Sequence, residues 1–137
     1  MKKKIFATLA ALVVSAVAIF AYKALTWEHY SKELLPNTAT DIREHRTDSF
    51  PSDFLDCMIA RITADEYAEY TKKLNSVSTW NIPLESRPDE NFTGFSDAPN
   101  WWKPPSSNQT TKYRKQGSTV EITTFSNGFL YYMTWET

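Results

Sequence analysis

The chain has 137 residues, of which 42% are hydrophobic, and this length allows one small domain besides a leader. Four of its 15 Lys and Arg residues precede residue 26, which leaves 11 basic against 16 acidic residues and a formal charge of −5. An acidic remainder disfavours nucleic acid as a partner, because phosphate binding requires a basic face. The 3 glycines are scattered, which excludes glycine-rich phosphate-binding loops.

The N-terminal segment has the pattern of a membrane anchor. Lysines at positions 2–4 precede an uncharged run over residues 5–22, which Lys23 ends. A helix of this run rises about 27 Å, close to the ~30 Å hydrocarbon core, so residues 5–25 are predicted to hold the chain in a membrane. The basic flank predicts a single-pass protein of the bacterial inner membrane, with its N-terminus in the cytoplasm and its C-terminal domain outside.

A cleaved signal peptide is the alternative interpretation of this leader. Ala16 and Ala18 occupy the two positions that a signal peptidase reads, and cleavage after Ala18 gives a secreted or periplasmic domain. The uncharged run is longer than the apolar region of about 7–15 residues that is usual in signal peptides. This length favours the anchor.

The leader sets the domain organisation that we predict. A signal anchor covers residues 1–25, a stalk covers residues 26–35 and an extracytoplasmic α+β domain covers residues 36–137. Pro36 marks the start of the domain, because a proline disfavours helix at the residue before it.

Two strands and a helix are predicted in the first half of the domain. Thr40 to His45 form a possible first strand, and the short apolar run from Phe54 to Ile62 indicates a largely buried strand. Thr63 and Glu66 have the spacing of a capping box, so a helix should run from Ala64 to Leu74. Its core face is expected to consist of residues at helical spacing: Ala64, Tyr67, Ala68, Thr71 and Leu74.

Residues 75–118 show little periodicity and contain several prolines. A compact domain seldom includes so long a stretch without regular structure. We therefore expect a short strand near Val77 to Ile82 and a packed loop around Trp101 and Trp102.

The C-terminal segment predicts a β-hairpin. Strand-like residues at Thr119 to Ser126 and Phe129 to Glu136 flank Asn127-Gly128, the pair that best suits a two-residue type I′ turn. The pairing gives one face that should be core: Val120, Ile122, Phe129, Tyr131, Met133 and Trp135. Glu121, Thr123, Tyr132 and Thr134 are expected to point away from it. The predicted fold class is α+β, a transmembrane helix followed by a small antiparallel β-sheet packed on one α-helix.

The residues that usually carry metal or covalent chemistry are few. Neither His29 nor His45 has a second histidine or a cysteine three or four residues away, so we predict neither a metal nor a cofactor. Cys57 is the 1 cysteine of the chain, and with His45 it forms a dyad only if the fold brings the two together. A cysteine in an apolar strand is more often an inert core residue.

Carboxylates support one enzymatic alternative. Several acidic residues flank the first two predicted strands, and paired acids can perform hydrolysis. The alternative function is a hydrolase of envelope material in which His45, Asp53 or Asp56 acts as acid or base. It requires these side chains to converge in one concave pocket.

Two segments are candidates for binding. Trp101 and Trp102 lie in a proline-stiffened loop, where they can stack on a sugar ring or a peptide or contact the bilayer interface. The alternative is that one of them closes the open edge of the core. Lys112, Arg114 and Lys115 form a basic cluster that can contact an anionic group, although such a cluster is more often a solvated loop.

Three short motifs lie in the exported part, namely Leu35-Pro-Asn-Thr-Ala-Thr-Asp-Ile42, Trp101-Trp-Lys-Pro104 and Gly128-Phe-Leu-Tyr-Tyr132. Together they resemble a pattern of small exported bacterial proteins of unknown function, many of which are lipoproteins. The resemblance implies a location rather than an activity. The chain lacks the lipobox cysteine of the lipoproteins, which leaves the helix to anchor it.

These features predict a membrane-tethered extracytoplasmic module that binds a protein or an envelope component without catalysis. A tether, a compact sheet and an aromatic loop suit such a module, and a small immunity or inhibitor protein has the same features.

Overall fold

The computed structural model describes residues 8, 10–19, 30–49, 53–77, 79–92, 98–106 and 108–136. The chain divides into two compact units, Met1–Glu33 and Leu34–Thr137, which we describe separately.

The first unit is helical where it is described. Residues 8 and 10–19 are α-helical, and a short helix α2 covers Tyr30–Glu33. Among the described residues, no helix has both the length and the apolar character that crossing a bilayer requires. Much of the predicted anchor over residues 5–25 lies outside the described residues.

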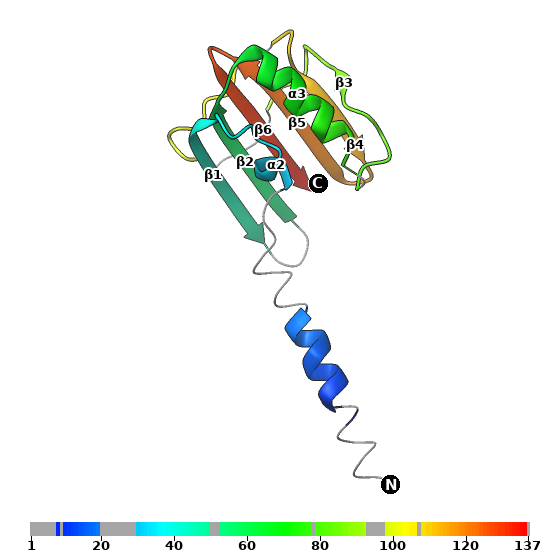
Figure 1. The fold of residues 1–137 in the computed structure, drawn as a ribbon. Coiled ribbons are helices and arrows are strands. Elements are labelled where there is room, and N and C mark those ends of the chain that lie inside the picture. Colours follow the sequence, from blue (N-terminus) through cyan, green and yellow to red (C-terminus); the bar gives the residue numbers. More distant parts are fainter. Residues whose placement is uncertain are drawn as a thin grey trace. The chain divides into compact units, whose positions relative to one another are not determined.

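The second unit contains an antiparallel β-sheet with helix α3, Ala64–Asn75, packed on it (Figure 1). Within the described residues the sheet has six strands in the order β1-β2-β6-β5-β4-β3. Their bounds are β1 Thr40–Ser49, β2 Asp53–Arg61, β3 Glu85–Ser86, β4 Lys112–Gln116, β5 Thr119–Ser126 and β6 Phe129–Glu136. The predicted α+β class and the antiparallel sheet are confirmed.

The C-terminal hairpin is confirmed in its strands, its turn and its register. Strands β5 and β6 pair with Ser126 opposite Phe129 and Val120 opposite Trp135. Asn127 and Gly128 have φ angles of 53° and 82°, the positive values that a type I′ turn requires at both central residues.

The start of helix α3 is also confirmed. The Thr63 backbone N–H donates to Glu66 Oε2 at 2.7 Å, and the Glu66 N–H donates to Thr63 Oγ1 at 3.2 Å, which completes the capping box. A hydrogen bond from the Thr38 hydroxyl and, second, the bond from the Thr63 backbone N–H lower the pKa of the Glu66 carboxyl. A Ser/Thr cap with a reciprocal Glu satisfies amides that have no partner inside the helix.

The predicted core face of this helix was wrong in part. The buried side chains are Tyr67, Tyr70 and Leu74, whereas Ala64 and Ala68 are exposed and Thr71 is half-buried. Tyr70, which is not in the predicted set, is buried at 1% exposure.

Three strands differ from the prediction. Strand β1 continues beyond His45 to Ser49. Strand β4 forms where the sequence favoured a solvated loop. The strand predicted near Val77 to Ile82 is absent from the described residues of that stretch, which are turns and bends. The short strand β3 lies instead at Glu85–Ser86, where it pairs with β4.

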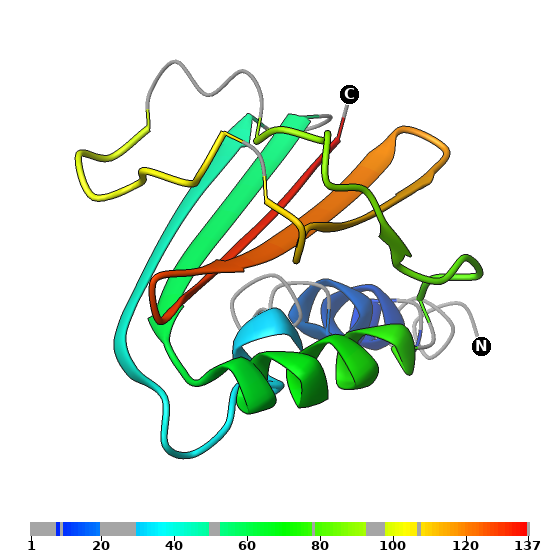
Figure 2. The same ribbon diagram turned by 90° about the horizontal axis from the view of Figure 1, so that it is seen from above.

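Both faces of the sheet are covered, by different parts of the chain (Figure 2). Helix α3 packs on the face that carries Phe125, whose ring stacks on Tyr67 with centroids 5.6 Å apart. Residues 98–106 cover the opposite face through Trp102. We call these two faces the helix side and the tryptophan side.

The helix side is the face that we expected to point away from the core. Glu121, Thr123, Tyr132 and Thr134 lie there and are buried, so that expectation was wrong. Their polar groups are satisfied internally: Thr123 Oγ1 donates to Tyr131 O at 2.9 Å, and Thr134 Oγ1 donates to Val120 O at 2.9 Å. A polar residue can be buried at small cost when it has such a partner.

The capping box gives a test of the local energetics. Thr63→Ala should lower the free energy of unfolding by about 1 kcal/mol, because a helix-start amide loses its acceptor. The measurement is urea denaturation followed by circular dichroism. Thr71→Ala, in the same helix, is the matched control and should change stability by less than about 0.5 kcal/mol. Equal losses in the two variants would contradict the capping role.

Candidate functional site

Trp102 is the central side chain of the tryptophan side. It is 8% exposed and packs with Cys57, Ile122 and Met133 in one apolar cluster. Its ring lies 5.9 Å from the ring of Tyr131 and meets it edge to face. Trp102 therefore closes the core. This agrees with the alternative prediction that one of the two tryptophans covers the open edge of the core.

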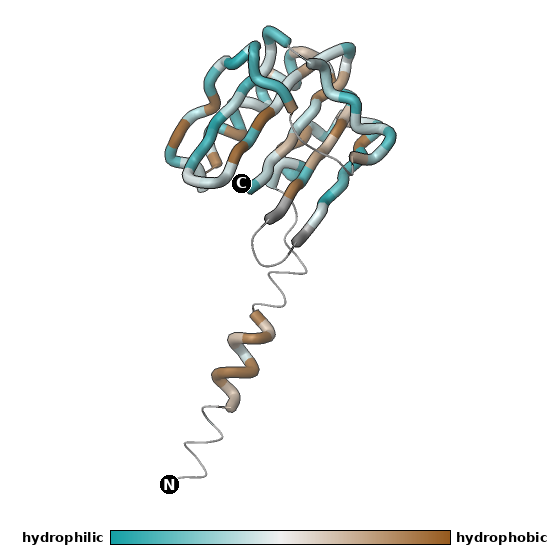
Figure 3. Tube along the Cα trace, turned by 180° about the vertical axis from the view of Figure 1, so that it is seen from behind, coloured by the Kyte–Doolittle hydropathy of each residue, from teal (hydrophilic) through white to brown (hydrophobic). Residues whose placement is uncertain are grey.

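Trp101 has a different environment from its neighbour. It is half-buried, and its ring meets the edge of Trp102 at a centroid distance of 6.1 Å. Other half-buried aromatic rings pack on the same cluster. Together with Trp101 they form one set: Phe92, Trp101, Tyr113, Tyr131 and Trp135. We call this set the aromatic surface; Figure 3 shows the Cα trace of the chain from behind the view of Figure 1.

Strand geometry gives the aromatic surface its arrangement. Successive side chains of a strand point to opposite faces, so Tyr131 and Trp135 of β6 lie on the same face as Tyr113 of β4. Burial raises the pKa of the Tyr131 hydroxyl, and burial together with the nearby Glu90 carboxylate raises that of Tyr113. Both phenols are therefore neutral hydrogen-bond donors at physiological pH.

The same alternation separates the basic residues that the sequence placed together. Lys112 and Arg114 lie on the helix side, whereas Lys115 lies on the tryptophan side and is exposed. The structure thus brings Trp101, Trp102 and Lys115 to one face of the sheet and the other two residues to the opposite face.

Arg114 is buried at 3% exposure and holds helix α3 against the sheet. Its Nε donates to Glu121 Oε2 at 2.5 Å, its Nη2 donates to Leu74 O at 3.1 Å, and Trp80 covers its guanidinium at 4.4 Å. Tyr132 Oη donates to the other carboxylate oxygen of Glu121 at 2.7 Å. These contacts occupy the guanidinium, so Arg114 acts in the fold rather than at a solvent-accessible binding surface.

Cys57 and His45 are direct partners across strands β1 and β2, so the fold does bring them together. Burial, with a smaller contribution from the Asp56 charge, raises the pKa of the Cys57 thiol from 9.0 to about 12. A nucleophilic cysteine needs a lowered pKa, so this thiol is a core group.

Asp56, one of the two acidic residues of the hydrolase alternative, does not converge with His45. Asp56 is adjacent in the strand to Cys57 and therefore lies on the helix side, while His45 lies on the tryptophan side. The Asp53 side chain lies outside what the structure describes. In the described parts of the chain, no group of three or more His, Cys, Asp and Glu residues could hold a metal ion.

Sequence reasoning missed part of the aromatic surface. Tyr131 and Trp135 lie on the predicted core face and pack on its cluster, whereas Phe92 and Tyr113 are not among the residues that the sequence pointed to. The alternation of Tyr113 with Lys112 and Arg114 was a usable signal, because it indicates a strand with one aromatic face. Comparisons of the chain with protein-family models, curated proteins and solved structures gave no match.

The buried ion pair gives a stability test. Arg114→Met should lower the free energy of unfolding by about 3–5 kcal/mol, because it leaves the Glu121 carboxylate buried without its cation. Arg114→Met combined with Glu121→Met should be less destabilising than the single change, since no unpaired charge remains. Urea denaturation of both variants measures the difference. A double variant that is no more stable than the single one would contradict the ion-pair account.

The Cys57 thiol gives a reactivity test with a defined pH dependence. Its folded pKa of about 12 predicts little labelling by iodoacetamide at pH 8 in the native protein, and rapid labelling in urea. Because the pKa of this thiol is higher in the folded state than in the unfolded state, the protonated thiol contributes fully to the free energy of unfolding below about pH 9. This contribution is lost as the pH rises toward 12. Cys57→Ala should therefore reduce the alkaline loss of stability. Equal labelling rates in the native and unfolded states would contradict this assignment.

Proposed function

We propose that this protein is a membrane-tethered extracytoplasmic binding module, and that its aromatic surface contacts a protein partner in the bacterial envelope. The observation that carries the proposal is the position of Trp101, half-buried among other half-buried aromatic rings and next to the fully packed Trp102. Tryptophan and tyrosine on a rigid base are the residues that most often dominate the energy of protein interfaces.

The rigidity of the base supports this proposal. Trp102 fixes the backbone of residues 98–106 on the sheet, and the backbone N–H of Trp102 donates to Pro99 O at 2.8 Å. A side chain held in place before binding loses little conformational entropy when a partner covers it. Trp101 is therefore suited to be an anchor of the interface.

The apolar leader supports the tether. In the described helical residues of the first unit, large apolar side chains are exposed: Leu12, Val13, Val14, Val17 and Ile19. Exposed aliphatic side chains around a helix favour an apolar surrounding, and the lysines before them favour retention of the N-terminus in the cytoplasm. The proposed location is the inner membrane, with the domain of residues 36–137 outside the cytoplasm.

A small immunity or inhibitor protein is the form of binding module that we favour. Such a protein acts by covering a surface of its partner, which requires a stable scaffold and an exposed recognition patch and no reacting group. The likeness of the three short motifs to small exported bacterial proteins agrees with this placement.

Photo-crosslinking in cells tests the proposal. A photoreactive phenylalanine analogue at Ser106, an exposed residue four positions after Trp102, should give a discrete crosslinked product. Trp101→Ala in the same chain should reduce the yield of this product by more than fivefold, because truncation of an interface anchor costs at least about 1–2 kcal/mol.

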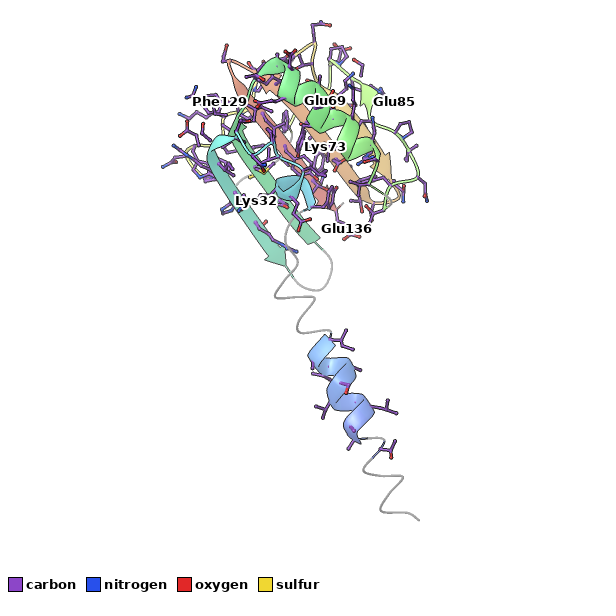
Figure 4. All side chains as sticks on the ribbon, in the orientation of Figure 1. Lys32, Glu69, Lys73, Glu85, Phe129 and Glu136 are labelled. Atoms are coloured by element: carbon purple, nitrogen blue, oxygen red, sulfur yellow. The ribbon has the colours of Figure 1, made fainter. Side chains whose placement is uncertain are left out.

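The matched control carries the same analogue at Lys73 on helix α3, which faces away from the tryptophan side (Figure 4). It should give no product of the same mass. Absence of a product from position 106, or an equal product from position 73, would contradict the proposed binding surface.

A further inference from the structure

The charges of the described sheet are distributed unevenly between its two faces. On the helix side, the acidic residues Glu44, Asp56 and Glu121 lie beside the basic residues Arg46, Lys112 and Arg114. Exposed cations lie on the tryptophan side: Arg43 on β1 and Lys115 on β4. The exposed Lys103 follows Trp102 in the segment that covers this side. A domain with net negative charge thus presents cations beside its aromatic surface.

Two basic residues elsewhere in the domain are held in ion pairs. Arg61 pairs with Asp41 at 2.8 Å, and Lys72 pairs with Glu69 at 2.5 Å. For Lys103 and Lys115, in contrast, the described part of the chain supplies no carboxylate within ion-pair distance. Both side chains are also exposed, so a ligand can reach their ammonium groups.

The register places one of the two lysines close to the aromatic rings. Lys115 pairs with Val120, and Val120 pairs with Trp135, so the three residues form one row across β4, β5 and β6. Two strand spacings separate Lys115 from Trp135, which is about 10 Å between their backbones. A segment of a few residues that covers Trp135 can thus reach the ammonium group as well.

The acidic boundary of this region lies at the other end of β4. Glu85 pairs with Tyr113 across β3 and β4, and its carboxylate lies 3.8 Å from Arg87. The carboxylate of Glu90 also acts on the Tyr113 hydroxyl. The register therefore makes Lys115 and Trp135 the cationic end of this surface, and the exposed Lys103 adds a cation directly after Trp102.

We propose that the partner covers this surface with an acidic polypeptide segment, whose carboxylates lie at Lys103 and Lys115 and whose apolar side chains contact Trp101 and Trp135. This inference rests on the proposed function, because it names the chemistry of the partner at the same surface. Charge complementarity sets orientation and association rate, while the aromatic rings supply affinity. The rest of the acidic domain repels such a segment and so leaves one face for docking.

Mass spectrometry of the product crosslinked through position 106 tests the inference in the full chain in its membrane. The partner peptide joined to the analogue should carry more Asp and Glu than Lys and Arg. Lys103→Glu and Lys115→Glu should each reduce the yield by more than fivefold, whereas Lys73→Glu, the same charge change on helix α3, should leave it within twofold. The yield in isolated membranes should also fall between about 50 mM and 500 mM NaCl, because salt screens exposed charges.

The outcomes separate this inference from the proposed function. A product whose joined segment is basic or neutral, or a nucleic acid or a glycan, overturns the acidic-segment inference and leaves the binding surface in place. A loss of yield in Lys73→Glu equal to that in Lys115→Glu overturns it too, because the effect then comes from net charge alone. If the unchanged chain gives no product at position 106, the proposed function itself fails.

Discussion

The central strands of this sheet carry apolar side chains on both faces, and the rest of the domain is arranged around the need to cover them. Cys57 and Met133 lie on one face, and Met58 and Tyr132 lie on the other, with almost no exposure. Helix α3 has 12 residues and can cover one face only. Residues 98–106 take over the second face, and Trp102 supplies the large side chain that this requires.

This covering arrangement links the fold to the proposed recognition. Because Trp102 packs onto the sheet, the preceding residue Trp101 is held at the outer edge of the cluster with part of its ring accessible. On the opposite face, Arg114 connects the end of helix α3 to β4 and β5. That contact removes its positive charge from the surface and leaves Lys115 as the exposed cation of β4.

Local sequence signals predicted the elements that depend on local physics. The type I′ pair Asn127-Gly128 and the capping residue Thr63 fix short-range hydrogen bonds, so the hairpin and the helix start followed from them. The sequence could not show that Glu121 is buried, because its partner Arg114 comes from a strand whose basic pattern resembles a solvated loop. The role of Trp102 depends on long-range packing, which hydrophobic periodicity does not encode.

The stability of Trp102→Ala tests this account most directly. If Trp102 closes the tryptophan side, its truncation should lower the free energy of unfolding by about 3–5 kcal/mol, the usual cost of removing a buried aromatic side chain. It should also increase the binding of a hydrophobic dye to the folded protein, because the face that holds Cys57 and Met133 would be uncovered. A loss below about 1 kcal/mol with unchanged dye binding would show that residues 98–106 do not cover this face, and would contradict the account.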